Sequence, residues 1–330
     1  NKKKFKTFVY HIGSVNDHIT DLIKKNCFSF SQKTNIDKVI NQIISDQLDV
    51  LIFLDIGMEP KMQILGSLKL ATIQCCALGV PVTTGLKNID YFLSAESMET
   101  NFSQKYYSEK LIKLPDLSVD YDIPTKTDIN DLNNTDKEDK VIFLNLQSNY
   151  KLLPQHDHIY FEIIKKNSKC KFWFIGSKNE FISNKFKERI SAMCKENGLF
   201  FDDFFVFYPQ MSYQSYLGLI SKSDIILDSI DWSGFNTSLD ALSLDKPIVT
   251  LPSNFMRGRH TYGILKILKM DELICDSMKE YVNLSVKLST NSNFYDNIIE
   301  KIKMNKKLVF NNHKTIKSLE FFLESLFKEN

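Results

Sequence analysis

The chain alternates between short hydrophobic runs and amphipathic stretches over most of its length. Residues 49–54 form a continuous apolar run, which is typical of a parallel strand that is covered on both faces. Residues 35–47 instead carry apolar side chains three or four positions apart, and this spacing predicts a helix. Strand patterns of the first kind cover residues 5–12, 28–30, 49–54, 72–78, 90–93, 110–114, 141–146, 170–175, 204–207, 224–228 and 247–251.

Helical patterns lie between these predicted strands and become denser toward the end of the chain. They cover residues 16–25, 35–47, 58–69, 154–166, 184–196, 212–221, 258–269, 279–288, 295–306 and 314–328. Strands that alternate with helices are typical of parallel sheets with helical crossovers. The pattern therefore predicts an α/β fold.

A polar stretch interrupts the alternation near the middle of the chain. Residues 122–139 are nearly free of large apolar side chains, and a chain of 330 residues is long enough for two cores. We therefore expect an N-terminal domain over 1–118 and a C-terminal domain over 140–310. Residues 119–139 are the expected linker. Residues 311–330 are expected to form a C-terminal helix that packs back on the first domain.

Composition and charge exclude several classes of function. The 42 basic and 40 acidic residues nearly balance, which favours neither a nucleic-acid partner nor a membrane surface. No apolar run is long enough for a membrane span, and no signal peptide opens the chain. The six cysteines are scattered, as expected of free thiols in the cytoplasm, and no histidine cluster has the spacing of a metal site.

The polar turn after predicted strand 224–228 suits an anion. It contains Gly234, Asn236, Thr237 and Ser238, and a helical pattern follows at once. The first amides of a helix point outward without internal partners, and the helix dipole adds positive charge there. This pattern predicts a phosphate or diphosphate site. The alternative is that Asn236 and Thr237 only cap the helix.

Three common nucleotide and hydrolase motifs are absent from the sequence. There is no G-x-G-x-x-G, no G-x-x-x-x-G-K-[ST] and no G-x-S-x-G. The sequence predicts two α/β domains, and the second contains a turn that could bind a phosphate. This combination is typical of a nucleotide-sugar transferase of the GT-B kind. In open parallel sheets, ligands bind outside the carboxyl ends of the strands.

Several ordered motifs carry a specific resemblance. W-S-G-F-N-T-S-L-D-A-L-S-L-D-K-P-I-V-T-L-P (232–252) is followed by F-M-R-G-R-H-T-Y (255–262). Earlier in the chain stand L-D-I-G-M-E-P (54–60), P-V-T-T-G-L-K-N-I-D-Y-F (81–92), Y-S-E-K-L-I-K-L-P (107–115) and Q-S-N-Y-K-L-L-P (147–154). Together they resemble bacterial SPINDLY-like proteins, in the glycosyltransferase family that contains the O-GlcNAc transferase.

The resemblance implies a GT-B fold of two Rossmann-like domains whose parallel sheets face a cleft. It implies an inverting, metal-independent transfer of GlcNAc or another hexose to a protein Ser or Thr hydroxyl. The donor would be a UDP- or GDP-sugar, with no other cofactor. Domain 1–118 would lie on the acceptor side, and domain 140–310 would bind the nucleotide sugar. Tetratricopeptide repeats usually precede this region in the family, so the resemblance implies them in the full-length protein. The chain begins with Asn and lacks the family's first strand, and we therefore expect it to be a fragment.

The resemblance also assigns roles to single residues. Lys151 would bring a cation to the donor phosphates, and Thr83 and Thr84 would border the sugar and acceptor. Alternatively, Lys151 is a solvated lysine and the two threonines are ordinary turn residues. The remaining donor-site residues would be Gly234, Asn236, Thr237 and Ser238 at the helix start, Asp240 at the ribose, Gln210, Met211 and Tyr216 at the base, and Arg259 at the phosphates.

Some of these assignments have a simpler alternative. Arg257 and Arg259 could pair with surface carboxylates, and Tyr216 could belong to the core. Val80 and Phe235 occupy positions where the family commonly has histidine. They favour a second hypothesis, an inactive module that binds a nucleotide sugar or another protein. A third hypothesis, an epimerase, requires carboxylates in the cleft.

Overall fold

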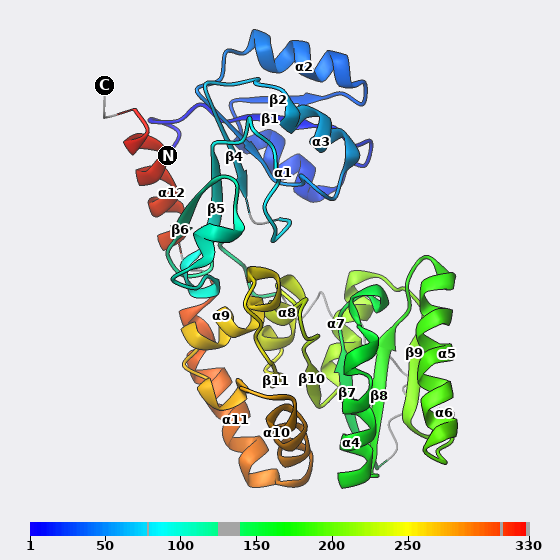
Figure 1. Cartoon of the computed structure of the whole chain (residues 1–330). Coiled ribbons are helices and arrows are strands. Elements are labelled where there is room, and N and C mark those ends of the chain that lie inside the picture. Colours follow the sequence, from blue (N-terminus) through cyan, green and yellow to red (C-terminus); the bar gives the residue numbers. More distant parts are fainter. Residues whose placement is uncertain (78, 125–138, 311–312, 328–330) are drawn as a thin grey trace. The chain divides into compact units, whose positions relative to one another are not determined.

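The computed structural model describes residues 1–77, 79–124, 139–310 and 313–327. Most of the predicted linker 119–139 therefore lies outside the described residues, as does Leu78 at the end of a predicted strand. The chain forms two compact units. Unit 1 comprises Asn1–Ser94, Asn101–Leu114 and Lys317–Asn330, and unit 2 comprises Ala95–Thr100 and Pro115–Ile316. Figure 1 draws unit 1 mostly in blue and cyan, and unit 2 mostly in green, yellow and orange.

Unit 1 contains two parallel sheets. One pairs β1 with β2, and the other has the order β3-β4-β5-β6. The strands are β1 (Phe8–His11), β2 (Ser29–Gln32), β3 (Val50–Phe53), β4 (Ile73–Ala77), β5 (Tyr91–Ala95) and β6 (Lys110–Leu114). The helices between them are α1 (His18–Asn26), α2 (Ile36–Ser45) and α3 (Pro60–Ser67).

The last helix of the chain, α12 (Lys314–Ser325), packs on the sheet of unit 1 from Lys317 onward. Leu319 and Phe322 contact a buried cluster of Cys75, Leu93 and Leu114. The ring of Phe322 also meets that of Tyr91 edge-on, with 5.4 Å between the centroids. Figure 1 shows α12 alongside β5 and β6. The apolar face of this helix is thus used inside unit 1.

Unit 2 contains one parallel sheet of five strands in the order β11-β10-β7-β8-β9. Figure 1 shows the strands in this order across the unit. They are β7 (Val141–Asn145), β8 (Cys170–Ile175), β9 (Phe205–Tyr208), β10 (Ile225–Leu227) and β11 (Ile248–Val249). The flanking helices are α4 (His158–Lys166), α5 (Glu180–Glu196), α6 (Phe201–Phe204), α7 (Tyr213–Lys222), α8 (Asn236–Ser243), α9 (His260–Ile267), α10 (Met278–Thr290) and α11 (Ser292–Asn305).

The sheet of unit 2 is covered on both faces, as its apolar strands predict. Phe143, Phe172, Trp173 and Phe174 are all buried on neighbouring strands. Cys75, Cys76, Cys170, Cys194 and Cys275 are buried, and all six cysteines are free thiols. The prediction of parallel α/β sheets is confirmed. Within the part of the chain that the structure describes, no helix is long and apolar enough to cross a membrane.

Most predicted helices begin or end within three residues of the observed ones, and two differ more. The pattern over 154–166 is divided into a short 3-10 turn, Pro154–His156, and helix α4. Helix α5 begins at Glu180, four residues earlier than predicted, because the side chain of Asn179 accepts a hydrogen bond from the amide of Phe181 and caps it. The short helix α6 was not predicted.

Candidate functional site

The strand order of unit 2 changes direction between β7 and β10. From β7 the chain moves outward through β8 and β9, and then returns to the other side of β7 with β10 and β11. In a doubly wound sheet, ligands bind in the crevice beyond the carboxyl ends of the strands at such a point. The loops that follow β7 and β10 therefore form the candidate site.

Buried amide side chains fix the loop after β7. Asn145 donates from Nδ2 to the carbonyl of Leu227 on β10 (3.0 Å), and its Oδ1 accepts from the backbone amide of Gln147 (3.0 Å). Asn149 is also buried and donates to the carbonyl of Ile175 at the end of β8 (3.2 Å). These contacts hold the 3-10 turn that ends at Lys151.

Lys151 is linked to the start of α8 through one side chain. Its Nζ donates to Oε1 of Gln147 (3.1 Å), and Nε2 of Gln147 donates to Oγ1 of Thr237 (2.6 Å). Burial lowers the pKa of Lys151, and the charge of Asp228 partly opposes this. The structure thus brings together the predicted cation and the predicted anion-binding turn. Gln147 opens the quoted motif 147–154, but its bridging role was not predicted.

The start of α8 carries no side-chain cap. Phe235 occupies the N-cap position, with φ −111° and ψ −82°, and its side chain has no oxygen to accept an amide. Thr237 has its hydroxyl against Gln147, and Asn236 is exposed. The alternative that Asn236 and Thr237 only cap the helix is therefore wrong. The amides of Ser238 and Leu239 donate to the carbonyl of Phe235, whereas those of Asn236 and Thr237 have no hydrogen bond among the described residues and keep their capacity for a ligand.

A buried carboxylate shapes the turn before α8. Asp228 accepts hydrogen bonds from the hydroxyls of Ser233 (2.7 Å) and Thr250 (2.7 Å) and from the amide of Gly234 (2.8 Å). Burial raises the pKa of Asp228, and these hydrogen bonds oppose the rise. Asp228 was predicted only as the end of a strand, and its position directly after an apolar run was the available signal.

Gly234 has a steric role rather than a donor role. A Cβ at this position would lie 2.5 Å from Oγ1 of Thr237 and 2.7 Å from Nε2 of Gln147. Its amide is already used by Asp228. Ser238 is similarly engaged, because its buried hydroxyl contacts the carbonyl of Gly234 (3.1 Å) and Oγ1 of Thr261 (2.8 Å). Both residues shape the turn, and a direct ligand contact from either stays a prediction.

Two cations lie near the ring of Trp232. Nζ of Lys151 is 5.5 Å from the ring centroid, and the guanidinium carbon of Arg257 is 5.8 Å from it. Arg259 is held differently. It donates to the carbonyls of Met98 (3.0 Å) and Ser253 (3.2 Å), and its guanidinium carbon lies 4.1 Å from the ring centroid of Tyr262. Neither arginine forms an ion pair among the described residues, so the alternative of pairing with surface carboxylates has no support there.

Tyrosines surround the carboxylate of Asp240. Oδ1 accepts from the hydroxyls of Tyr213 (2.7 Å) and Tyr121 (2.8 Å), and burial raises the pKa of Asp240 against these bonds. The ring of Tyr216 stacks on that of Tyr213, with 6.0 Å between the centroids. The buried Tyr216 hydroxyl meets no partner at hydrogen-bond geometry among the described residues, but it lies close enough to the carboxylate of Asp240 to help lower the pKa of that carboxylate.

Tyr213 and Tyr121 were not predicted as site residues. Two other predicted residues lie in the loop before α7. Gln210 is exposed and Met211 is half-buried. The structure therefore places Tyr216 and Asp240 close together, with Gln210 and Met211 just ahead of the helix that carries Tyr216.

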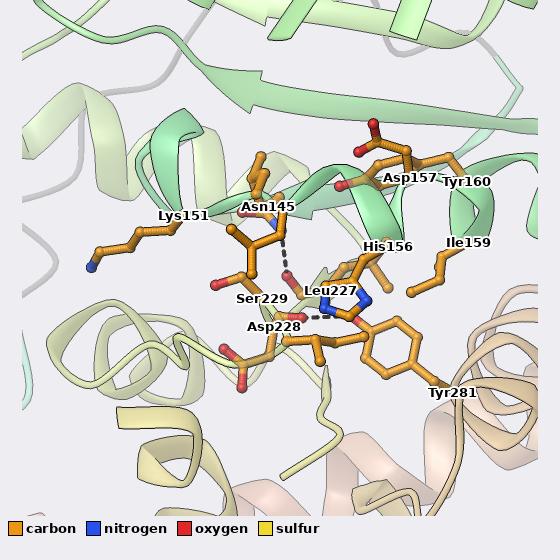
Figure 2. A pocket seen from close by; sticks show the side chains of 13 residues that line it. Asn145, Lys151, His156, Asp157, Ile159, Tyr160, Leu227, Asp228, Ser229 and Tyr281 are labelled. Atoms are coloured by element: carbon orange, nitrogen blue, oxygen red, sulfur yellow. Dashed lines mark hydrogen bonds between the residues drawn. The ribbon is translucent and has the colours of Figure 1, made fainter. Parts of the chain in front are cut away.

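A small cavity lies behind Lys151 (Figure 2). Its volume is about 30 Å³, which is room for about one water molecule and far too little for a sugar. Nε2 of His156 lies 3.1 Å from Oδ2 of Asp231, and its buried Nδ1 has no partner among the described residues. Figure 2 shows the ammonium of Lys151 directed away from His156 and Tyr281. The amine therefore points out of this cavity.

The two predicted threonines of unit 1 are tied to one carboxylate. Glu109, which is only 2% exposed, accepts from the hydroxyl of Thr83 (2.8 Å), the amide of Thr84 (2.8 Å) and the hydroxyl of Thr84. Burial alone would raise the pKa of Glu109, but the hydrogen bonds from Thr84 and Thr83 outweigh it and lower the pKa. Glu109 was not predicted, although it lies in the quoted motif 107–115.

The comparison with protein families decides what this fold and site belong to. The sequence profile of glycosyl transferase family 41 matches residues 124–319. The chain belongs to glycosyl transferase family 41.

Individual relatives of this family 41 chain include plant and bacterial proteins. The probable UDP-N-acetylglucosamine–peptide N-acetylglucosaminyltransferase SEC of Arabidopsis thaliana is 26% identical over 78% of this chain and 26% of the relative. The UDP-glucose:protein N-beta-glucosyltransferase of Actinobacillus pleuropneumoniae serotype 5b is 23% identical over 78% of this chain and 40% of the relative. This chain thus corresponds to less than half the length of either protein.

A solved structure supports the fold. A mutant of the Thermobaculum terrenum O-GlcNAc transferase superposes with a TM-score of 0.84 over 96% of this chain and 61% of that chain, at 17% identity. The predicted fold class, α/β of the GT-B kind with two Rossmann-like domains, is confirmed.

Val80 and Phe235, at the two positions where the resemblance implies histidine, make apolar contacts in this family 41 chain. Val80 is buried and lies against Gly57. Phe235 packs on His260, with 5.4 Å between the ring centroids. His260 is buried, its Nδ1 lies 3.2 Å from the carbonyl of Ser233, and burial lowers its pKa to about 4. A neutral histidine therefore stands behind the α8 turn, supplied by the motif 255–262.

Proposed function

We propose that this family 41 chain is an inverting, metal-independent glycosyltransferase. It transfers GlcNAc or another hexose from a UDP- or GDP-sugar to a Ser or Thr hydroxyl of a protein. The printed names of its relatives, which describe transfer of N-acetylglucosamine or glucose from UDP-sugars to peptide or protein, support this proposal. The six free thiols suit a reducing compartment, and we keep the cytoplasm as the expected location.

One observation carries the proposal: Lys151 is joined through Gln147 to Thr237 at the uncapped start of α8. This arrangement lies at the switch point of a parallel sheet, where ligands bind. A half-buried ammonium interacts more strongly with an anion than a fully solvated one does. The helix amides and the helix dipole add further positive potential. Together they suit a diphosphate.

These groups support the proposed chemistry at the leaving group. In an inverting transfer, the acceptor oxygen forms a bond to the anomeric carbon while the bond from that carbon to the diphosphate oxygen breaks. Negative charge then builds up on the departing nucleoside diphosphate. Lys151 and the amides of α8 would stabilise that charge as it develops. The acceptor hydroxyl gives its proton to a general base, and we assign no described residue to that role.

Asp240 and its tyrosines suit the nucleoside part of the donor. Oδ1 already accepts from Tyr213 and Tyr121, and Oδ2 would accept from a ribose hydroxyl. The stacked rings of Tyr213 and Tyr216 provide an aromatic surface of the kind on which bases stack. Thr83 and Thr84, held by Glu109, would border the sugar and acceptor.

Titration calorimetry with UDP and GDP in the presence of EDTA tests the proposal. We expect one nucleotide to bind, and we expect Lys151→Ala to weaken that binding by about 1.5–3 kcal/mol, the range for a hydrogen bond to a charged group. Lys195→Gln on α5 is the matched control, because it removes an exposed positive charge outside the site. If wild-type protein binds neither nucleotide, the proposed function is wrong.

Phe235 favours a second candidate, a module that binds the sugar nucleotide without turnover. It occupies a position where the family resemblance implies a histidine, and its ring packs on His260. Hydrolysis or transfer of a radiolabelled UDP- or GDP-sugar separates the two candidates. Binding without any product would select the module, and a gain of product in Phe235→His would show which group is missing.

A further inference from the structure

Arg257 is positioned beside the α8 turn by its own backbone. It lies in a 3-10 turn, Met256–Gly258, and its carbonyl accepts from the amide of Ser233 at 2.7 Å. The neighbouring Gly258 is packed tightly, since a Cβ there would lie 3.3 Å from Cα of Asp231. The backbone of Arg257 is therefore fixed against the loop that leads into α8.

The guanidinium of Arg257 has no polar partner among the described residues. It rests on two rings instead, with its central carbon 4.8 Å from the centroid of Phe255 and 5.8 Å from that of Trp232. The chain has only three arginines among its 42 basic residues, and the other two are both hydrogen-bonded. Arg189 pairs with Asp157, and Arg259 donates to backbone carbonyls. Arg257 thus keeps its N–H groups for a partner that is not part of the fold.

Lys151 and Arg257 both lie near one indole ring, and neither forms an ion pair with a carboxylate among the described residues. Their centres are 5.5 Å and 5.8 Å from the centroid of Trp232. Like charges that gather near one ring repel each other, and an anion between them relieves this repulsion. A guanidinium is suited to phosphate because it presents planar, paired N–H donors, and it also stacks on aromatic rings.

We propose that Arg257, rather than Arg259, is the second diphosphate-binding side chain of the donor site. It acts with Lys151 on the diphosphate of the nucleotide sugar, and Trp232 holds both cations in place. This inference rests on the proposed function, because it names the residue that completes the same site. Arg259 serves as a structural clamp between Met98 and Ser253.

The test is a comparison of three ligands, uridine, UMP and UDP, by calorimetry with EDTA present. The guanosine series replaces them if GDP is the nucleotide that binds. We expect Arg257→Gln to weaken UDP binding about tenfold or more, as for a lost charged hydrogen bond. The effect on UMP should be smaller, and uridine binding should not change. Arg257→Lys should lie between wild type and Arg257→Gln, because it keeps the charge and loses the paired donors.

Lys195→Gln on α5 again controls for the loss of one positive charge. The inference is overturned if Arg257→Gln binds UDP within about twofold of wild type while Lys151→Ala loses it. An equal loss for uridine and UDP also overturns it, since the substitution would then act on the fold of the turn. If wild type binds none of the ligands, the proposed function fails first and the inference fails with it. If Arg257→Gln does not fold, Arg257→Lys against wild type still decides the question.

Discussion

In each unit of the chain a buried carboxylate holds a polar loop, Asp228 in unit 2 and Glu109 in unit 1, and the pKa values of the two carboxylates shift in opposite directions. Asp228 in unit 2 gathers Ser233, Gly234 and Thr250. Glu109 in unit 1 gathers Thr83 and Thr84. Burial raises the pKa of Asp228, whereas hydrogen bonds outweigh burial and lower the pKa of Glu109. The same device therefore shifts the two pKa values in opposite directions, because burial dominates at Asp228 and the hydrogen bonds dominate at Glu109.

The number of segments that each carboxylate joins predicts which loop depends more on its carboxylate. Asp228 joins three segments, since Thr250 lies just after β11 while Ser233 and Gly234 precede α8. Glu109 joins only two segments, the loop that contains Thr83 and Thr84 and the start of β6. We therefore expect the α8 turn to suffer more from loss of its carboxylate than the threonine loop does.

The largest expected effect is that of Asp228→Ala. It leaves the hydroxyls of Ser233 and Thr250 and the amide of Gly234 without their acceptor in a buried space. Each unsatisfied donor costs about 1–3 kcal/mol, so the free energy of unfolding of unit 2 should fall by at least about 3 kcal/mol. Both tryptophans, Trp173 and Trp232, lie in unit 2, so urea unfolding followed by tryptophan fluorescence reports that unit. A loss below about 1 kcal/mol would show that the turn does not depend on Asp228.

The next largest effect is expected for Glu109→Gln. It turns charged hydrogen bonds into neutral ones, so the free energy of opening the threonine loop should fall by about 1.5–3 kcal/mol. Hydrogen exchange of peptides from residues 81–92 measures this loss within unit 1. Peptides from α8 serve as the internal control, because that helix belongs to unit 2. Equal deprotection of both regions would mean general unfolding and would contradict a local role.

The effect of Glu109→Gln should also depend on pH. The pKa of Glu109 is lowered in the folded state, so its contribution is present above the usual glutamate value of 4.5 and is lost as the pH falls through the folded pKa. The difference in protection between wild type and Glu109→Gln should therefore shrink as the pH falls below about 4.5. Asp228 has the opposite sign: its raised pKa means that its ionised form opposes folding, and this opposition is relieved as the pH falls. A difference that grows on acidification would contradict the assignment for Glu109.

The sequence predicted most of the fold because buried parallel strands are continuous apolar runs. The run at 141–146 became β7, and the run at 170–175 became β8. The start of α5 was missed because its cap, Asn179, precedes a first turn whose Phe181 is exposed. Helix α6 is only four residues long, which is too short to show a helical period.

The candidate site was predictable as residue types but not as contacts. Lys151 and Thr237 were both identified from motifs, yet Gln147 joins them across 90 residues of sequence, and only the adjacency of β7 and β10 brings it there. Arg257 and Arg259 are two residues apart and chemically identical. Their difference comes from tertiary partners, since the carbonyls of Met98 and Ser253 engage only Arg259.

The smallest expected effect is that of Tyr213→Phe, which removes one of the two hydroxyls on Oδ1 of Asp240 and leaves that of Tyr121. The carboxylate keeps a donor, so the free energy of unfolding of unit 2 should fall by only about 1 kcal/mol. Tyr150→Phe is the matched control, because that side chain is 62% exposed and a surface change of this kind costs under about 0.5 kcal/mol. Tryptophan fluorescence in urea measures the free energy of unfolding of both variants.

The affinity for the nucleotide then decides what the hydroxyl of Tyr213 does in the site. Unchanged or tighter binding in Tyr213→Phe would mean that the hydroxyl serves the carboxylate alone, because Asp240 remains free to accept a ribose hydroxyl. Weakening of about tenfold would instead place that hydroxyl directly on the ligand.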